Sequence, residues 1–376
     1  MLRIGYDAKR LFNNFTGLGI YSRTLLGNLA NAAPENEYWL YTPKIKQHVE
    51  TQRFLSGQPF HVQTPGRGNA AWWRSIGIKK DLSRDGIQLF HGLSHEIPLG
   101  LPRSGIPSVV TMHDLIFKRY PDQYAYPDRL IYDWKFRYAC RHADCIVAIS
   151  ESTKTDIVEF YDIDPKRIEV IYQSCDARFA QPLPPENIDC VVQKYGLPQN
   201  YLLYVGSIIE RKNLLRIVQA LELLPSDLRL PLAVVGKGGA YEKRVRQYIA
   251  EKRLEPWVHF IAPVFAELPA LYRGASVFLY PSACEGFGIP VIEALNCGVP
   301  VITSNVSSLP EAGGPGAWLV DPASTEDIVE GIRVLLTNEE ERNARIAKGL
   351  NHARRFDSSV VTKEMLGLYA EILSRP

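Results

Sequence analysis

The chain has 376 residues, 46% of them hydrophobic and 22% charged, a balance that lets about two globular domains each bury a core. Its formal net charge of +2 argues against a nucleic-acid-binding protein that relies on attraction to phosphates. Six cysteines without C-x-x-C spacing predict reduced thiols in a cytoplasmic protein, with neither a zinc site nor a disulfide framework.

The first residues pass straight into a predicted strand, which leaves no room for a signal peptide. No apolar run approaches the roughly 20 residues that span a bilayer. We therefore expect a soluble protein, or one that binds peripherally at the inner face of the membrane.

Short β-rich runs alternate with amphipathic helical patterns along the whole chain, which predicts stacked βα units and parallel sheets. The predicted strands lie near 2–6, 38–41, 60–63, 87–90, 107–112, 145–149, 168–172, 201–206, 231–235, 258–262, 276–280, 300–303 and 317–320. The fold class is therefore α/β.

We expect two doubly wound, Rossmann-like domains that face a central cleft. Residues 1–178 form the first domain and residues 200–356 the second, while the proline-rich stretch 179–199 is a semi-rigid linker. A C-terminal helix over 357–376 is expected to complete the first domain. Ligands of such sheets bind beyond the carboxyl ends of the strands.

Two glycines, Gly17 and Gly19, precede the first long helical pattern. Ser22 replaces the third glycine of a dinucleotide fingerprint, and the run starts about ten residues after the first strand, which argues against a nicotinamide cofactor. Two interpretations remain: a mobile loop whose backbone faces a ligand, or a plain glycine turn.

A run of aromatic and basic residues without an acid lies between positions 67 and 80. Its members are Arg67, Trp72, Trp73, Arg74, Lys79 and Lys80. The run could lie against a membrane surface or contact an anionic acceptor. We favour an ordinary helix with partly buried tryptophans.

His113 emerges at the end of a predicted strand, where it could donate to a sugar hydroxyl or transfer a proton. A structural histidine that caps its strand fits the pattern equally well. Asp162 and Asp164 offer a pair of carboxylates, but an aspartate before Pro165 is ordinary turn chemistry, so we expect a turn and no metal site.

Arg211 and Lys212 stand where a strand gives way to a helix. Two cations at a helix start oppose the helix dipole, which prefers acids there, and such a broken local rule indicates a functional site. Arg211 can fork onto phosphate oxygens, and Lys212 can act as a point charge. The alternative is a pair of solvated surface cations.

Glu285 and Glu293 bracket a predicted unit of strand, glycine loop and helix. Gly286 and Gly288 let the backbone approach a ligand, and the N–H groups of the helix start favour an anion. Acids that accept hydroxyl hydrogens beside amides that receive phosphate suit a phosphorylated sugar. The alternative is a solvated loop acid with a second acid that only complements the helix dipole.

Six elements occur in order across both predicted domains: 16–21, 111–114, 146–153, 206–214, 285–293 and 301–311. With them the chain resembles the retaining glycosyltransferases of the GT-B fold, specifically glycosyltransferase family 4, over nearly its whole length. The shared pattern includes two glutamates with seven residues between them, here Glu285 and Glu293.

The resemblance implies a role for each candidate site residue. Glu293 would hold the ribose hydroxyls of a nucleotide, and Glu285 would contact the donor sugar. Arg211 and Lys212 would neutralise the diphosphate leaving group. The amides that would approach the sugar and the diphosphate are those of Gly286, Phe287, Gly288 and Ile289.

The resemblance also extends to the first domain and to the base. Gly19 would close over the diphosphate, and His113 would orient the donor sugar. The base would contact the backbone near Val264. Many members carry an arginine where this chain has Ser207, so Arg211 would supply that charge. Asp7, at the end of the first strand, is a candidate for contact with the acceptor.

The predicted function is retaining transfer of a hexosyl unit from a nucleotide sugar to a glycan or lipid-linked acceptor in surface polysaccharide synthesis. The best match for the donor is GDP-mannose. Since cations stand at the leaving group, we expect no divalent metal and no other cofactor. We expect no nucleic-acid partner either, and contact with a membrane would be through the first domain. The alternatives are an inert nucleotide-sugar-binding protein and a GT-B nucleotide-sugar epimerase.

Overall fold

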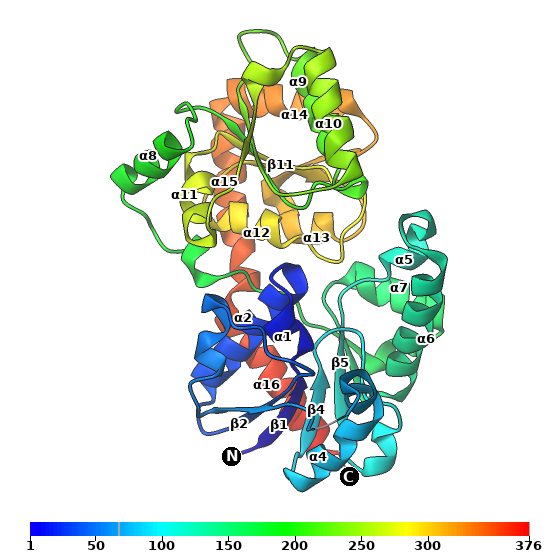
Figure 1. Cartoon of the computed structure of the whole chain (residues 1–376). Helices are drawn as coiled ribbons and strands as arrows, with labels where there is room; N and C mark the ends of the chain where they lie inside the picture. Colours follow the sequence, from blue (N-terminus) through cyan, green and yellow to red (C-terminus); the bar gives the residue numbers. More distant parts are fainter. Residues whose placement is uncertain (67, 376) are drawn as a thin grey trace. The chain divides into compact units, whose positions relative to one another are not determined.

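The computed structural model describes residues 1–66 and 68–375. Two compact units make up the chain (Figure 1). Unit 1 comprises Met1–Ser174 and Asp357–Pro376, and unit 2 comprises Cys175–Phe356. The proline-rich stretch 179–199, expected as a linker, lies inside unit 2, where Pro185–Lys194 form helix α8.

Within the described residues, unit 1 contains a seven-stranded sheet in the order β3-β2-β1-β4-β5-β6-β7, and every pairing in it is parallel. The strands are β1 (Arg3–Asp7), β2 (Glu37–Tyr41), β3 (Phe60–Gln63), β4 (Leu89–Gly92), β5 (Ser108–Met112), β6 (Cys145–Ala148) and β7 (Ile168–Val170).

Helices cover both faces of this sheet, each through an apolar stripe. Side chains of α1 (Lys9–Asn13), α2 (Gly17–Ala32) and α16 (Ser358–Ser374) form one core with one face. Side chains of α4 (Ile78–Arg84), α6 (Tyr126–His142) and α7 (Glu151–Tyr161) form a second core with the other. The short helices α3 (Ala70–Trp72) and α5 (Ile116–Arg119) lie in connections. The C-terminal helix α16 thus belongs to unit 1.

Within the described residues, unit 2 contains a six-stranded parallel sheet in the order β10-β9-β8-β11-β12-β13. The strands are β8 (Leu202–Val205), β9 (Leu232–Val235), β10 (Val258–Ile261), β11 (Val277–Tyr280), β12 (Val301–Ser304) and β13 (Ala317–Val320). Its remaining helices are α9 (Leu214–Leu223), α10 (Ala240–Glu251), α11 (Leu268–Gly274), α12 (Ile289–Asn296), α13 (Leu309–Gly313), α14 (Thr325–Thr337) and α15 (Glu339–Ala353).

The predicted α/β architecture is confirmed, and each predicted strand is present within two residues of its expected limits. Both sheets have the strand order of doubly wound nucleotide-binding folds. In that order the first strands are added on one side of the starting strand and the later strands on the other side. The direction in which strands are added therefore reverses between β1 and β4 in unit 1, and between β8 and β11 in unit 2. A crevice forms beyond the carboxyl ends of strands at such a reversal.

None of the helices in the described part of the chain is both long and apolar enough to cross a bilayer.

Candidate functional site

The central reversal of unit 2 brings two predicted motifs together. Arg211 and Lys212 follow β8, and Glu285 follows β11, and these two strands are paired neighbours. Their loops therefore leave the same edge of the sheet side by side. This is the position at which doubly wound sheets bind their ligands.

The two cations lie on a single 3₁₀ turn, Glu210–Lys212, that directly precedes α9. Asn213 ends this turn in the left-handed conformation, with φ of 63°. Its side-chain amide donates to the carbonyl of Pro281 at 3.0 Å and to that of Pro322 at 2.7 Å. Asn213 therefore ties the loop after β8 to the loop after β11.

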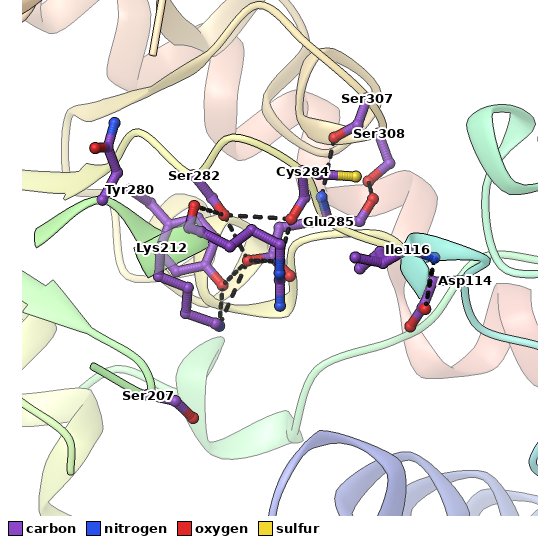
Figure 2. A network of polar contacts seen from close by, with 12 residues as sticks. Asp114, Ile116, Ser207, Lys212, Tyr280, Ser282, Cys284, Glu285, Ser307 and Ser308 are labelled. Carbon is purple, nitrogen blue, oxygen red and sulfur yellow. Dashed lines mark hydrogen bonds and ion pairs between the residues drawn. The ribbon is translucent and has the colours of Figure 1, made fainter. Parts of the chain in front are cut away.

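A charge cluster forms where these loops meet, and it consists of Arg211, Lys212, Glu285, Tyr280 and Ser282. Figure 2 labels all of its members except Arg211. One oxygen of Glu285, Oε1, lies 2.9 Å from a guanidinium nitrogen of Arg211 and 3.5 Å from Lys212 Nζ. The same oxygen accepts hydrogen bonds from Ser282 Oγ (2.8 Å) and the Tyr280 hydroxyl (3.0 Å). Lys212 Nζ donates to the Tyr280 hydroxyl at 2.5 Å.

The three charged side chains are only 11–14% exposed, so they lie in a largely dry site. Burial alone would raise the pKa of Glu285, but the charges of Lys212 and Arg211 and the hydrogen bond from Ser282 lower it to about 2. Burial lowers the pKa of Lys212, although Glu285 opposes this shift. Glu285 is therefore an ionised carboxylate at neutral pH.

Two serines from the next loop hold the glycine loop 281–288 in place. Ser307 Oγ accepts a hydrogen bond from the backbone N–H of Glu285 at 3.0 Å. Ser308 Oγ donates to the carbonyls of Glu285 (2.8 Å) and Phe287 (2.9 Å). The backbone that carries the carboxylate is thus fixed by side chains that lie beyond β12.

Helix α12 begins at Ile289, directly after the glycine loop. Gly288 has φ of 124°, and a Cβ there would lie 3.0 Å from the Leu309 side chain, so the position requires glycine. Phe287 is buried, which leaves only its backbone to face a ligand. The amides of a first helical turn have no intrahelical acceptor, and they attract anions.

Glu293 lies on α12 and is only 6% exposed. Its Oε2 accepts a hydrogen bond from the Tyr272 hydroxyl at 2.9 Å. Burial raises the pKa of Glu293 to about 7, and Asp176 adds to this, while Tyr272 and Lys212 oppose it. Glu285 and Glu293 therefore differ in charge near neutral pH, because their surroundings shift their pKa values in opposite directions.

Two other candidates of unit 2 lie on its surface. Ser207 is exposed, and its carbonyl accepts a hydrogen bond from the Tyr204 hydroxyl at 3.0 Å. Val264 is 61% exposed. Its N–H donates to Glu267 Oε2 at 3.2 Å, and its carbonyl accepts from the N–H of Glu267 at 3.0 Å. A base that binds near Val264 would have to share or replace these contacts.

His113, in unit 1, is buried, and both of its ring nitrogens are used. Nε2 donates to the carbonyl of Leu93 at 2.9 Å, and Nδ1 accepts from the Gln173 amide at 3.0 Å. The rings of Tyr21 and His95 pack edge-on against it. Burial, with the nearby His95, lowers the pKa of His113 to about 3, so the ring is neutral. These contacts match the structural interpretation of His113, and they oppose proton transfer by its ring in this conformation.

Gly17 and Gly19 form the first turn of α2, so the expected mobile loop over these glycines is wrong. A Cβ on Gly19 would lie 1.8 Å from the carbonyl oxygen of Asn14, which requires glycine at this position. The N–H of Gly19 donates to the carbonyl of Thr16 at 2.9 Å. The amide expected to meet a diphosphate is therefore satisfied within its own turn.

Asp7 ends β1, and Arg74 pairs with both of its carboxylate oxygens. Arg74 also donates to Glu96 Oε2 at 2.9 Å, and Lys135 lies 3.0 Å from the same oxygen. Burial would lower the pKa of Arg74, but Asp7 and Glu96 raise it well above its usual value. The Asp7 carboxylate is thus occupied by a buried cation.

The aromatic and basic run around Trp73 is helical, as expected. Trp73 is half-buried and donates its Nε1 hydrogen to Asp81 at 2.6 Å, whereas Trp72 is 59% exposed. Arg67 lies outside the described residues.

Asp162 and Asp164 form the expected turn. Asp162 ends α7 in the left-handed conformation, and Asp164 caps the following turn by accepting from the N–H of Lys166 at 2.9 Å. No group of three or more potential metal-ligating side chains occurs within residues 1–66 and 68–375.

Tyr280, whose hydroxyl bridges Lys212 and Glu285, was not predicted as a site residue. In the sequence this tyrosine is one more apolar residue of a strand. We expect Tyr280→Phe to lower kcat about tenfold with little change in KM for the donor. The alkaline limb of the pH–rate profile should move to lower pH, because Lys212 loses an acceptor that favours its charged form.

Tyr201→Phe is the matched control, since the Tyr201 hydroxyl is also buried but donates to the carbonyl of Leu271, which is not a member of the charge cluster. A pH–rate profile of Tyr280→Phe that overlays the wild-type profile would contradict this role for Tyr280.

Two doubly wound units, the second with buried cations and an ionised acid at its central reversal, are the architecture of the GT-B class. The chain belongs to glycosyltransferase family 4. Residues 16–179 match the model of Glycosyltransferase Family 4, and residues 191–352 match that of Glycosyl transferases group 1. The protein is therefore a glycosyltransferase.

Among its relatives, the O-antigen chain mannosyltransferase B of Escherichia coli is 31% identical over 380 residues, which are 94% of this chain and 96% of that protein. The O-antigen chain mannosyltransferase RfbU of Salmonella typhimurium is 28% identical, over 69% of this chain and 67% of RfbU. Among solved structures, HepE of Anabaena in complex with UDP shares the fold, with a TM-score of 0.79, 16% identity and coverage of 99% and 100% of the two chains.

Proposed function

We propose that this glycosyltransferase moves a mannosyl unit from GDP-mannose to a glycan or lipid-linked acceptor in surface polysaccharide synthesis, with retention of the anomeric configuration. The observation that carries the proposal is the charge cluster at the central reversal of unit 2. The names of the O-antigen mannosyltransferases, which are 28–31% identical, support mannose as the sugar.

The cluster suits the departure of a nucleoside diphosphate. As the bond between the anomeric carbon and the phosphate oxygen breaks, its electron pair remains on that oxygen. Arg211 and Lys212 are already oriented, and in a largely dry site such fixed charges stabilise the new negative charge with little reorganisation. The amides at the start of α12 would act in the same direction.

Glu285 has a different role in this proposal. In the unbound protein it offsets part of the charge of the two buried cations, which repel each other. A diphosphate that pairs with Arg211 and Lys212 would take over this function, and Glu285 would then be available to accept hydrogen bonds from hydroxyls of the donor sugar. The two cations would also supply the charge that a divalent metal supplies elsewhere.

Retention is proposed to follow from attack on the face of the sugar that the diphosphate leaves. The acceptor oxygen forms the new bond to the anomeric carbon, and its proton passes to the leaving phosphate oxygen. Charge on that oxygen makes it the base, so no side chain has to take the proton.

A thermal-shift panel of GDP, UDP and ADP, each with and without its sugar, tests the donor. A ligand that binds only the native state raises Tm by mass action. We expect GDP and GDP-mannose to give the largest shifts. A larger shift with UDP or ADP sugars would overturn the choice of donor.

Product analysis with GDP-mannose then tests the class of activity. Release of GDP that depends on an acceptor supports transfer. A free sugar isomer formed without an acceptor would indicate an epimerase, and binding without any release would indicate an inert binding protein.

A further inference from the structure

Helix α6 of unit 1 is apolar on two sides. Toward its C-terminal end, Phe136 and Ala139 are buried in the core beneath the sheet. On a different side, Tyr126, Leu130 and Trp134 follow one another at intervals of four residues and form one stripe, because a helix has 3.6 residues per turn. These three side chains are 67%, 55% and 55% exposed.

The run 126–134 has more exposed large apolar side chains than any other run of nine residues in the described chain. Five large apolar side chains of the run 126–134 are exposed, and Ile131 at 50% and Tyr132 at 36% complete the set. In unit 2 such residues are scattered, as Leu223 and Leu350 are. Single exposed apolar residues are normal on a soluble protein, but a contiguous group indicates an interaction site.

A second segment of the same character, 72–80, lies beside α6. Arg74 of this segment and Lys135 of α6 both pair with the carboxylate of Glu96, at 2.9 and 3.0 Å. Within the segment Trp72 is 59% exposed and Ile76 is 38% exposed. Lys79 and Lys80 follow one turn later.

Cations also border the stripe itself. The guanidinium of Arg129 lies 5.9 Å from the ring centre of Tyr126, so its charge sits at the edge of the apolar surface. Arg141 is exposed near the other end of α6. Residues 1–175 contain 22 Lys and Arg against 18 Asp and Glu, so the excess charge of this half has the same sign.

This composition distinguishes between two kinds of partner. The core of a protein–protein interface is poor in lysine. A surface that rests on a lipid bilayer combines Trp, Tyr, Leu and Ile with Lys and Arg, because the rings and aliphatic chains enter the headgroup boundary while the cations meet anionic lipids. Long basic side chains can bury their stems and keep their charges in water.

We propose that α6 and the segment 72–80 form a surface that docks on an anionic lipid bilayer. The lipid-facing side chains are Trp72, Ile76, Tyr126, Leu130, Ile131 and Trp134. Helix α6 lies at the margin of unit 1, beside α5 and α7 (Figure 1).

The location of this surface has a consequence that rests on the proposed function. The side chains that line one recess of unit 1 include those of Asp7, Arg74, Trp134 and Tyr138. Asp7 marks the carboxyl end of β1, the edge at which such sheets bind ligands. A bilayer on α6 would therefore hold a lipid-linked acceptor close to the ligand-binding edge of unit 1.

Co-sedimentation of the full chain with lipid vesicles tests the docking surface without any donor or acceptor. We expect binding to phosphatidylcholine vesicles that contain phosphatidylglycerol, weaker binding without it, and weaker binding at high salt. The double variant Leu130→Ser/Trp134→Ser should lower the partition coefficient about tenfold or more. The matched control is Leu223→Ser/Leu350→Ser, which removes exposed apolar residues from unit 2 and should bind as wild type does.

Several outcomes would contradict the proposal that this surface docks on a bilayer. Wild-type protein that stays in solution with both kinds of vesicle would do so, as would an equal loss of binding in both double variants. Light scattering that finds a wild-type dimer and a monomeric α6 variant would assign the stripe to a second copy of the chain instead. Because a nucleotide-induced rise in Tm is measured without lipid, failure of the surface and failure of the proposed function give different results.

Discussion

Replacing Lys212 by methionine is expected to lower kcat about 10²–10³-fold, the usual effect of removing one fixed charge that stabilises a transition state. Methionine keeps the aliphatic chain that packs against Gly206, so the loop should keep its shape. The protein should stay folded, since burial of the lysine charge is itself unfavourable, as its lowered pKa indicates. Single-turnover rates at saturating donor, together with a melting curve, measure both effects.

The control for this prediction is Lys348→Met, which removes an exposed lysine from α15 of the same unit. It should leave the rate unchanged. Transfer by Lys212→Met at the wild-type rate would remove Lys212 from the leaving-group site.

Binding of the nucleotide sugar is expected to depend on pH through Glu293. Its pKa is about 7, and an ionised carboxylate accepts hydrogen bonds from ribose hydroxyls more strongly than a neutral acid does. The Kd should therefore fall about tenfold between pH 6 and pH 8, because the ionised fraction rises over that range. Glu293→Gln should raise Kd about 10–100-fold at pH 8 and abolish this pH dependence.

The pH dependence of the free energy of unfolding has the opposite sign to that of binding. The folded-state pKa of Glu293 is raised from the ordinary value of 4.5 to about 7, so the native protein holds this proton at pH values where the unfolded chain has lost it. The contribution of Glu293 to the free energy of unfolding should thus decrease as pH rises from about 4.5 to about 7. In Glu293→Gln this part of the pH dependence should disappear.

Calorimetry with a nucleotide sugar suits the binding test better than a free nucleoside diphosphate, whose terminal phosphate also titrates near neutral pH. Glu326→Gln, at an exposed position of α14, is the control and should bind as wild type does. If Glu293→Gln kept both the affinity and the pH dependence of wild type, Glu293 would have no contact with the nucleotide.

The sequence predicted the fold in detail because strands and helices have different apolar periods. It also predicted that Arg211, Lys212 and Glu285 each follow a strand, at the edge where doubly wound sheets bind ligands, but the ion pairs between them are seen only in the structure. These residues were visible because they break local rules: cations stand at a helix start, and an acid stands in a glycine loop.

Other features depend on contacts between distant residues, which no local pattern records. The ring of His113 is occupied by Gln173, which lies sixty residues further along the chain. Asp7 is paired with Arg74, which lies 67 residues away. Tyr280 reaches Lys212 only because β8 and β11 are paired. In each case the type of amino acid could be interpreted from the sequence, but its interaction partner could not be predicted.

The stretch 179–199 shows the limit of composition as a guide. Its prolines suggested a linker, but a proline is tolerated in the first turn of a helix, and Pro185 is placed there in α8. This helix packs against α11, which makes the stretch a part of unit 2.

A crystal structure of the protein with bound GDP-mannose tests the central claim most directly. We expect the diphosphate within hydrogen-bond distance of Arg211 and Lys212, beyond the ends of β8 and β11, with the ribose hydroxyls on Glu293. A diphosphate bound elsewhere, with Arg211 and Lys212 still paired to Glu285 as in the unbound protein, would contradict the account.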